Sequence, residues 1–413
     1  MIVGLDIGTS CIRVAIGEVG EDGSVEIVGT SVRKSAGMRN GLIVNIEDAA
    51  AAIKDAVEVA EQNAGAEVTS CAIGIGGTQI EGLNQQGITP VTPPGKPRRE
   101  VTRADIDRAI DNARAVFIPQ DRELLHVVVQ SFTVDGAANI KDPVNMMCTR
   151  LEADVHVITA SKTTIQNVKR CVNRAGYMPI GVMLKTLAAT EAVVHEDEMD
   201  LGSILIDMGA GTTDVLVLLG GAPVCTVSIP VGGNLVTNDI AVVKGIPVSA
   251  AEKIKIESGC CWLDGIEDEK EVIIPGVGGR DPELTTQTEL CQIIQPRVEE
   301  IFSMVRSAVI TNSSVSQLSG NIILTGGGAQ MEGVIECAQA VFGTSSVRIG
   351  VPDKFGGRES EYRKPECATV IGLVLSNKNI VQEKSSRKSK KLFSSGSGEK
   401  DENILKKLKK IFF

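Results

Sequence analysis

Two stretches of this sequence share one pattern: IVGLDIGTS at residues 2–10 and ILIDMGAGTTD at residues 204–214. Each contains a short apolar run, an aspartate and a glycine turn with hydroxyl side chains. Each then leads into a second apolar run, at residues 12–16 or 215–219. Apolar runs joined by a glycine turn are typical of a β-hairpin. We therefore predict one such hairpin in each half of the chain.

The residue types in these turns suit a phosphate group. Glycines let backbone N–H groups come close to phosphate oxygens, and Ser or Thr hydroxyls add donors. An aspartate at the end of a strand, here Asp6 or Asp207, is able to hold Mg²⁺ through water. One such turn alone is more often an ordinary turn than a binding site, but two in register reverse that balance. Together the hairpins could clamp one nucleoside triphosphate from both sides.

A third segment fits the same kind of site. Residues 321–324 read as a buried strand, and TGGGAQ follows at residues 325–330. Three glycines at the end of a strand let a ligand approach the backbone closely, and a plain strand-to-helix turn needs fewer. Residues 249–255 have helical character and place Glu252 and Lys255 on one helix face. In isolation these two side chains are more simply a solvated ion pair.

Length and composition limit the possible classes of protein. At 413 residues the chain is long enough for at least two domains. A net charge of −10 argues against a general nucleic-acid-binding protein. No apolar run reaches the roughly 20 residues that cross a bilayer, and the first residues lack a secretory signal, so we expect a cytoplasmic location. Ten cysteines without a C-x-x-C pair and three scattered histidines argue against a metal centre or a thiol nucleophile.

The last residues differ in charge from the rest of the chain. Residues 383–413 contain ten Lys or Arg and four Asp or Glu, a net charge of +6, so residues 1–382 carry −16. Residues 382–400 have the Ser, Gly and Lys composition of a flexible linker. A helix over residues 401–413 would separate an apolar side from a basic side. These sides consist of Ile404, Leu405, Leu408, Ile411 and Phe412, and of Lys406, Lys407, Lys409 and Lys410.

A basic amphipathic helix at a chain end suits the headgroup layer of an anionic membrane. The alternatives are a solvated tail or a helix that docks on the body of the same protein. The flexible linker argues against docking, and the strict separation of the two sides argues against random tail composition. With so few apolar residues one helix would bind weakly and reversibly, so stable attachment would need many copies on one assembly.

Together these segments resemble the actin-like ATPase superfamily. Residues 6–10 are similar to its first phosphate loop, residues 207–214 to its second and residues 324–334 to its adenosine loop. Residues 186–194 resemble the helix that connects its two halves. Within the superfamily the sequence resembles the FtsA family of bacterial cell-division proteins over essentially its full length. Further matching stretches lie at residues 37–41, 125–127, 140–144, 275–280 and 295–297.

The resemblance implies an α/β, actin-like (ribonuclease H-like) fold with two halves and four subdomains. The predicted divisions are 1–81, 160–195 and 365–381 for subdomain 1A, 82–159 for an inserted subdomain 1C, 196–231 and 302–364 for subdomain 2A, and 232–301 for subdomain 2B. The loop of subdomain 1C after Pro143 departs from the family pattern. It carries Asn145 and Cys148 where the family tends to have glycines.

The resemblance also implies that ATP and Mg²⁺ lie between the halves. The residues expected at the nucleotide are Asp6, Gly8, Thr9, Ser10, Asp207, Gly209, Gly211, Thr212, Thr213, Gly232, Gly233, Glu252, Lys255, Gly326, Gly327 and Gly328. Asp6 and Asp207 would hold Mg²⁺ through water. Asp207 and Glu191, the latter in the connecting helix, would be the catalytic groups of a slow ATPase. We expect ATP to act mainly as a structural ligand.

For function, the resemblance implies a protein that polymerises on the inner face of the cytoplasmic membrane at the division site. There it would tether the ring of FtsZ, the tubulin-like division protein, and recruit later division proteins through subdomain 1C. Subdomain 2B would bind the C-terminal peptide of FtsZ, with Arg297 as a candidate contact because such peptides are usually acidic. The alternatives are a small-molecule (sugar) kinase, for which no sugar-binding motif is present, and a PilM-like pilus-assembly protein, in which the terminal helix is not expected.

Overall fold

The structure is a computed structural model that describes residues 1–20, 22–93, 95–115, 117–279, 281–313, 320–353 and 356–378. The predicted linker at 382–400 and the predicted amphipathic helix at 401–413 lie outside the described residues, so both stay predictions. Within the described ranges, no helix combines the length and the apolar character needed to cross a membrane.

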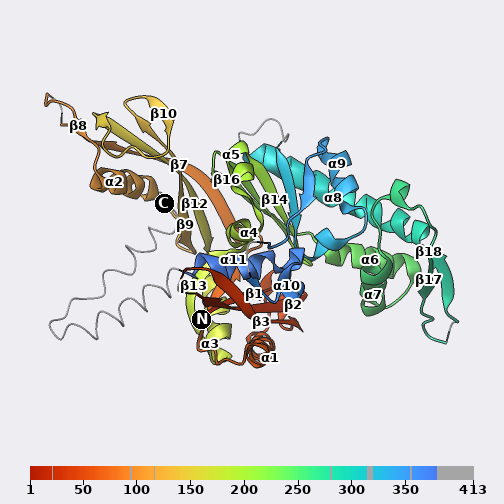
Figure 1. The fold of residues 1–413 in the computed structure, drawn as a ribbon. Helices are drawn as coiled ribbons and strands as arrows, with labels where there is room; N and C mark the ends of the chain where they lie inside the picture. Colours follow the sequence, from red (N-terminus) through yellow and green to blue (C-terminus); the bar gives the residue numbers. More distant parts are fainter. Residues whose placement is uncertain are drawn as a thin grey trace.

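The first half of the chain is built on a six-stranded sheet with the order β13-β6-β1-β2-β3-β21. The strands are Met178–Leu184, Ser70–Ile75, Ile2–Ile7, Cys11–Val19, Val25–Lys34 and Gly356–Gly357. β1 pairs antiparallel with β2 and parallel with β6. Helix α1 (Ile46–Ala64) packs on one face with α3 (Lys162–Arg174) beside it, and α11 (Ala368–Ser376) packs on the other face (Figure 1).

The second half contains a five-stranded sheet with the same plan, in the order β16-β15-β14-β19-β20. The strands are Ala222–Ile229, Thr213–Leu219, Ser203–Met208, Asn321–Thr325 and Val347–Ile349. The series β3-β2-β1-β6-β13 of the first sheet matches this order, with two antiparallel pairings followed by two parallel ones in both sheets. The repeated sequence pattern is therefore a repeated structure, and the hairpin predicted in each half is confirmed.

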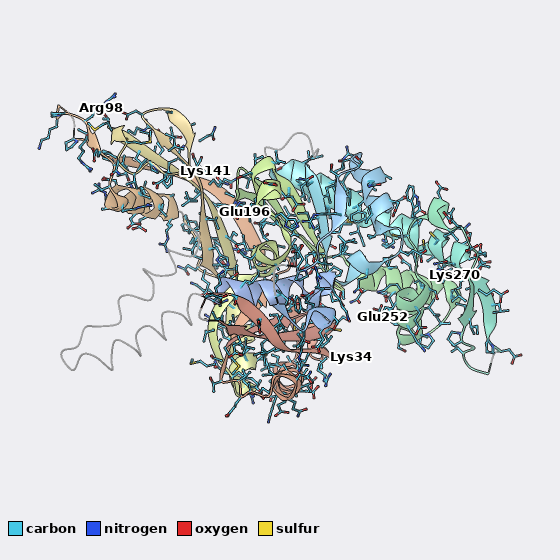
Figure 2. The ribbon with its side chains drawn as sticks, in the orientation of Figure 1. Lys34, Arg98, Lys141, Glu196, Glu252 and Lys270 are labelled. Carbon is cyan, nitrogen blue, oxygen red and sulfur yellow. The ribbon has the colours of Figure 1, made fainter. Side chains whose placement is uncertain are left out.

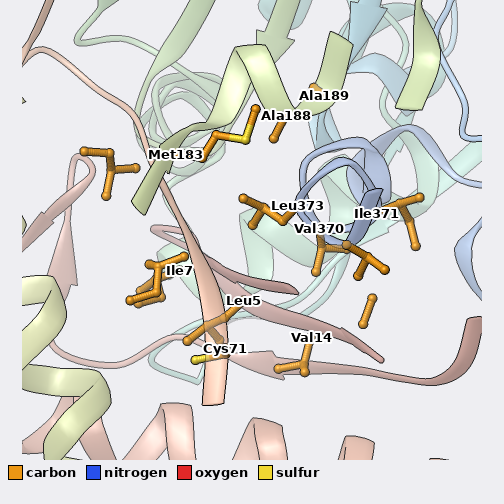
Figure 3. Packing of buried hydrophobic residues seen from close by; sticks show 14 of the residues in the cluster. Leu5, Ile7, Val14, Cys71, Met183, Ala188, Ala189, Val370, Ile371 and Leu373 are labelled. Carbon is orange, nitrogen blue, oxygen red and sulfur yellow. The ribbon is translucent and has the colours of Figure 1, made fainter. Parts of the chain in front are cut away.

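Two helices join the halves into one body. Helix α4 (Lys185–Val193) follows β13 and packs against α11 between the two sheets. Figure 3 shows Ala188 of α4 in the same cluster as Leu373 of α11 and Leu5 of β1. The two helices approach closely because residue 372 is glycine: a Cβ there would overlap the carbonyl oxygen of Ala188. On the far side of the second sheet, α8 (Gln287–Asn312) and α9 (Val334–Phe342) enclose a second core.

A four-stranded sheet projects from the body at the upper left of Figure 1. Its order is β10-β9-β12-β7, with bounds Ala137–Ile140, Arg122–Val134, Arg150–Ser161 and Ile80–Pro90. Helix α2 (Arg103–Arg114) packs on this sheet over a separate small core. The helix begins with a capping box in which the backbone and hydroxyl of Thr102 donate to the Asp105 carboxylate.

The projecting sheet contacts the second half directly. Lys141 (labelled in Figure 2) places Nζ 3.3 Å from Oδ1 of Asp200. His156 of β12 places Nε2 2.9 Å from Oγ1 of Thr226 in β16. In the loop that departs from the family pattern, Asn145 has a φ of 64°, a left-handed conformation that glycine and asparagine adopt readily.

The remaining part lies to the right in Figure 1, beside α8. It contains α6 (Gly233–Lys244), α7 (Val248–Ser258) and the hairpin of β17 (Glu271–Ile274) and β18 (Glu283–Thr286). The short elements of the molecule are β4 (Met38–Arg39), β5 (Leu42–Ile43), β8 (Arg99–Glu100), β11 (Met147–Cys148), α5 (Glu196–Leu201) and α10 (Glu359–Tyr362). The subdomain boundaries given above remain a proposal for dividing this architecture.

Candidate functional site

The turns of the two repeated hairpins have the same backbone geometry. In the first, the N–H of Gly8 donates to the carbonyl of Cys11 at 3.1 Å, and in the second the N–H of Gly209 donates to the carbonyl of Thr212 at 3.0 Å. A Cβ on Gly8 would lie 2.6 Å from that carbonyl oxygen, and one on Gly209 would lie 2.9 Å from its own. Both turns therefore need glycine at this position.

The two turns line one cavity of about 400 Å³. They nearly touch, since a Cβ on Gly211 would lie 2.8 Å from Oγ1 of Thr9. The predicted nucleotide residues that line this cavity are Asp6, Gly8, Thr9, Ser10, Asp207, Gly209, Gly211, Thr212, Gly233, Glu252, Lys255, Gly326, Gly327 and Gly328. Residues far apart in the chain thus meet as the sequence pattern predicted.

Three predicted residues lie elsewhere. Thr213 is buried, and its hydroxyl donates to the carbonyl of Val231 at 2.9 Å, so it serves the second core. Gly232 packs behind the second turn, where a Cβ would lie 2.5 Å from the carbonyl oxygen of Gly209. Glu191 is exposed near the end of α4 and does not line the cavity.

Three carboxylates of the cavity lining lie beside the two glycine turns. Asp6 and Asp207 end the equivalent strands β1 and β14, and Asp214 lies opposite Asp207 in the second hairpin. Burial, followed by the charges of Asp214 and Asp6, raises the pKa of Asp207 to about 7. Burial also raises the pKa of Asp214, although the N–H of Gly77 donates to it at 3.1 Å. Such clustering of like charges is typical of functional sites.

Sequence reasoning missed two members of this cluster. Lys185 lines the cavity, and its Nζ lies 2.7 Å from Oδ1 of Asp6. Burial favours its neutral form, but the neighbouring carboxylates, Asp6 first, hold the pKa of this lysine above its ordinary value. The sequence did contain a signal for this lysine, because Lys185 is the single charged residue between Met178 and Thr190. Asp214 was detectable from the register of the hairpin, which pairs it with Asp207.

Residues of α7 and the glycines after β19 also line the cavity. Glu252 and Lys255 form the predicted ion pair, with 2.6 Å between Nζ and Oε2. The pair is more than a solvated one, because Lys255 also donates to Oγ1 of Thr237 at 2.9 Å and to the carbonyl of Gly233 at 3.1 Å. Figure 2 labels Glu252 on α7.

Gly326 has a φ of 82°, and a Cβ there would overlap the carboxylate of Asp207, so only glycine lets β19 end so near β14. A short 3₁₀ turn, Gly327–Gln330, follows, and α9 begins only at Val334. Gly327 itself has open space beside it.

The donor set fits Mg²⁺ held through water. Asp6 and Asp207 present hard carboxylate oxygens to the cavity, and Mg²⁺ is usually bound by one or two carboxylates, several waters and substrate phosphates. No group of three or more His, Cys, Asp or Glu side chains in the described ranges has the arrangement of a direct metal site. The carboxylates therefore suit a hydrated ion better than a fully protein-bound one.

Arg297 lies on α8, away from this cavity. Its guanidinium forms two hydrogen bonds to Asp239 of α6, at 2.6 and 3.1 Å, and also pairs with Glu300. These carboxylates already neutralise the charge that was expected to attract an acidic peptide. A partner would have to displace them to use Arg297.

The fold and the cavity define a class of protein. Two equivalent α/β sheets, joined by a helix pair and meeting at two glycine turns, form the actin-like fold. Solved structures with this fold include the PilM–PilN type IV pilus biogenesis complex, with a TM-score of 0.64, 16% identity and coverage of 91% of this chain and 97% of that chain. MreB 5 of Spiroplasma citri bound to AMPPNP has a TM-score of 0.55 at 14% identity, covering 94% and 98%. The MamK double helical filament has a TM-score of 0.51 at 15% identity, covering 90% and 98%.

Sequence comparison narrows the class to one family. A family model described as "Cell division protein FtsA" matches residues 204–372, and one described as "SHS2 domain inserted in FTSA" matches residues 77–159. The cell division protein FtsA of Borreliella burgdorferi is 40% identical over 376 residues, which cover 91% of this chain and 90% of that protein. FtsA of Escherichia coli strain K12 is 34% identical over 381 residues, covering 91% and 89%. The chain belongs to the FtsA family of cell division proteins.

Proposed function

We propose that the cavity binds ATP with Mg²⁺ and that the bound nucleotide controls how this cell division protein assembles. The observation that carries the proposal is that the two equivalent glycine turns line a single cavity of about 400 Å³. Backbone N–H groups that the turns do not use themselves, and the hydroxyls of Thr9, Ser10 and Thr212, would donate to phosphate oxygens. Gly326, Gly327 and Gly328 would receive the adenosine. Glu252 and Lys255, which line the same cavity, would lie beside it.

Asp6 and Asp207 would hold Mg²⁺ through water, and the ion would neutralise phosphate charge. In hydrolysis, Asp207 is the one predicted catalytic residue that lines the cavity, so it would orient the attacking water. We therefore expect ATP hydrolysis to be slow at most, because Glu191 does not line the cavity. Closure of the halves around the nucleotide would change the angle between them and thereby the surfaces that stack into a filament.

We further propose that the protein polymerises on the cytoplasmic face of the membrane and tethers the FtsZ ring there. Membership of the FtsA family supports a role at the division site, and the predicted amphipathic helix at 401–413 supports the membrane contact. Residues 232–301 would bind the FtsZ C-terminal peptide, and residues 82–159 would recruit later division proteins. A chain without residues 82–159 is then expected to bind the peptide and to lose those later proteins in a pull-down.

Calorimetry with purified protein tests the nucleotide site. Wild-type protein is expected to bind ATP in the presence of Mg²⁺, whereas Asp6→Ala and Asp207→Ala should each weaken binding by about tenfold or more, since each removes a charged contact. Asp55→Ala is the matched control, because this aspartate is exposed on α1 and pairs with Arg33 outside the cavity. If the wild type binds no adenine nucleotide, or if both cavity variants bind as it does, the proposal is wrong.

A further inference from the structure

Lys185 is the first residue of α4, the helix that passes between the two halves. Its side chain is only 15% exposed, and that of Asp6 is 10% exposed. Nζ lies 2.7 Å from Oδ1 of Asp6 and donates to the carbonyl of Ile7 at 2.9 Å. The ammonium is therefore held at the end of β1, beside the first glycine turn.

Glycines in and just after the neighbouring strand β6 leave room for the side chain of Lys185. A Cβ on Gly74 would lie 3.2 Å from Cγ of Lys185, and one on Gly76 would lie 3.3 Å from its Cδ. The same Cβ on Gly76 would lie 2.8 Å from Oδ2 of Asp214. Because both positions are glycine, the lysine stem passes β6 and its charged end reaches the place where the carboxylates of the two halves meet.

The ammonium has capacity for a ligand. A lysine Nζ carries three N–H donors, and its contacts within the described residues are the oxygens of Asp6 and Ile7. Lys185 also lines the cavity. The third donor is thus available to an oxygen atom at the phosphate end, where Thr9 and Ser10 lie.

The charge balance of the cavity favours such a cation, a role that Lys185 shares with Arg13, which also lines the cavity. Asp6, Asp207 and Asp214 together would repel the phosphates of a nucleotide strongly in this buried place. The other lysine that lines the cavity, Lys255, is already paired with Glu252. On the basis of the nucleotide site proposed above, we propose that Lys185 binds the terminal phosphate directly and shares with Mg²⁺ the neutralisation of the three carboxylates.

The proposal predicts that Lys185 and Mg²⁺ partly replace each other. We expect EDTA in place of Mg²⁺ to weaken AMPPNP binding by about tenfold in the wild type, where the ammonium remains. In Lys185→Met, which keeps the length of the stem and removes the charge, we expect EDTA to weaken binding by about a hundredfold or more. Calorimetry gives the AMPPNP dissociation constant of each of the two proteins, with Mg²⁺ and with EDTA. These four values give the coupling between Lys185 and Mg²⁺ without any measurement of hydrolysis.

Lys255→Met is the matched control, because Lys255 also lines the cavity and is mostly buried, but its ammonium contacts Glu252, Thr237 and Gly233 instead of Asp6. It should weaken binding to the same extent with and without Mg²⁺. If Lys185→Met does the same, the lysine is only a structural support and the inference is wrong. If the Tm shows that Lys185→Met does not fold, the wild-type protein alone provides the test. A loss of AMPPNP affinity of about a hundredfold or more in EDTA would then contradict the inference. Wild-type protein that binds no AMPPNP even with Mg²⁺ would instead overturn the proposed function.

Discussion

Asp207 is buried at the meeting point of three carboxylates, and its surroundings oppose ionisation. Burial is the largest cause, the charges of Asp214 and Asp6 add to it, and the pKa rises from 3.8 to about 7. Because the raised pKa belongs to the folded state, the favourable contribution of the neutral carboxyl is complete below pH 3.8. It is lost as the pH rises through about 7.

We expect Asp207→Asn to raise the Tm of the nucleotide-free protein at pH 8 by about 2–4 °C, and by less at pH 5. The reason is that asparagine occupies the same space and cannot ionise. Calorimetric scans in EDTA at the two pH values measure the difference. Asp55→Asn, at an exposed position on α1, should leave the Tm unchanged at both. A gain that is equal at pH 5 and pH 8 would show that ionisation of Asp207 does not limit stability.

Helices α4 and α11 set the distance between the two sheets. Gly372 of α11 lies against the carbonyl oxygen of Ala188 in α4, with no room for a Cβ. Their contact forms part of a core that includes Leu5 of the first sheet and Leu205 of the second. The spacing of the halves, and with it the width of the cavity, therefore depends on this helix pair.

We expect Gly372→Ala to destabilise the protein by about 1–3 kcal/mol, because the added methyl group must push the two helices apart. Chemical denaturation followed by circular dichroism measures this change. Gly327→Ala is the control, since a Cβ at that position meets open space, and it should be close to neutral. Equal stability of the two variants would mean that α4 and α11 separate without cost.

At the scale of the whole molecule, one body carries the cavity, the projecting sheet and the part formed by α6, α7 and the β17–β18 hairpin. The cavity lies where the two halves meet, so a ligand there contacts both. The predicted membrane helix lies at the other end of a linker, at residues 401–413. Many weak helices on one filament would add up to stable attachment, because each further contact forms within an assembly already at the membrane.

We expect wild-type protein with ATP to form filaments on anionic lipid monolayers, as seen by electron microscopy. The triple variant Ile404→Asp, Leu408→Asp and Ile411→Asp should form none on lipid, because the apolar side of the helix is lost. A gold-labelled FtsZ C-terminal peptide added to the wild type should decorate the filaments.

The matched control places the same three charges in the linker, as Ser394→Asp, Ser395→Asp and Ser397→Asp. These changes leave the apolar side intact, so filaments should remain on lipid. Filaments of the triple helix variant on the same monolayers would contradict the membrane role of residues 401–413. Bare filaments after addition of the peptide would contradict the proposed link to FtsZ.

The sequence by itself determined the repeated hairpins and their glycine turns, because each depends on residues a few positions apart. Apolar periodicity and turn chemistry are local properties, and they appear directly in the order of residues. The family resemblance likewise followed from motifs that stay in one order along the chain.

Only the tertiary structure decided which charges meet. It placed Lys185 against Asp6 and against the carbonyl of Ile7. Lys185 and Ile7 are 178 positions apart in the chain. It paired Arg297 with Asp239 and left Glu191 outside the lining of the cavity. Pairings of this kind depend on how whole sheets and helices pack, and a packing contact between distant residues leaves no periodic trace in a single sequence.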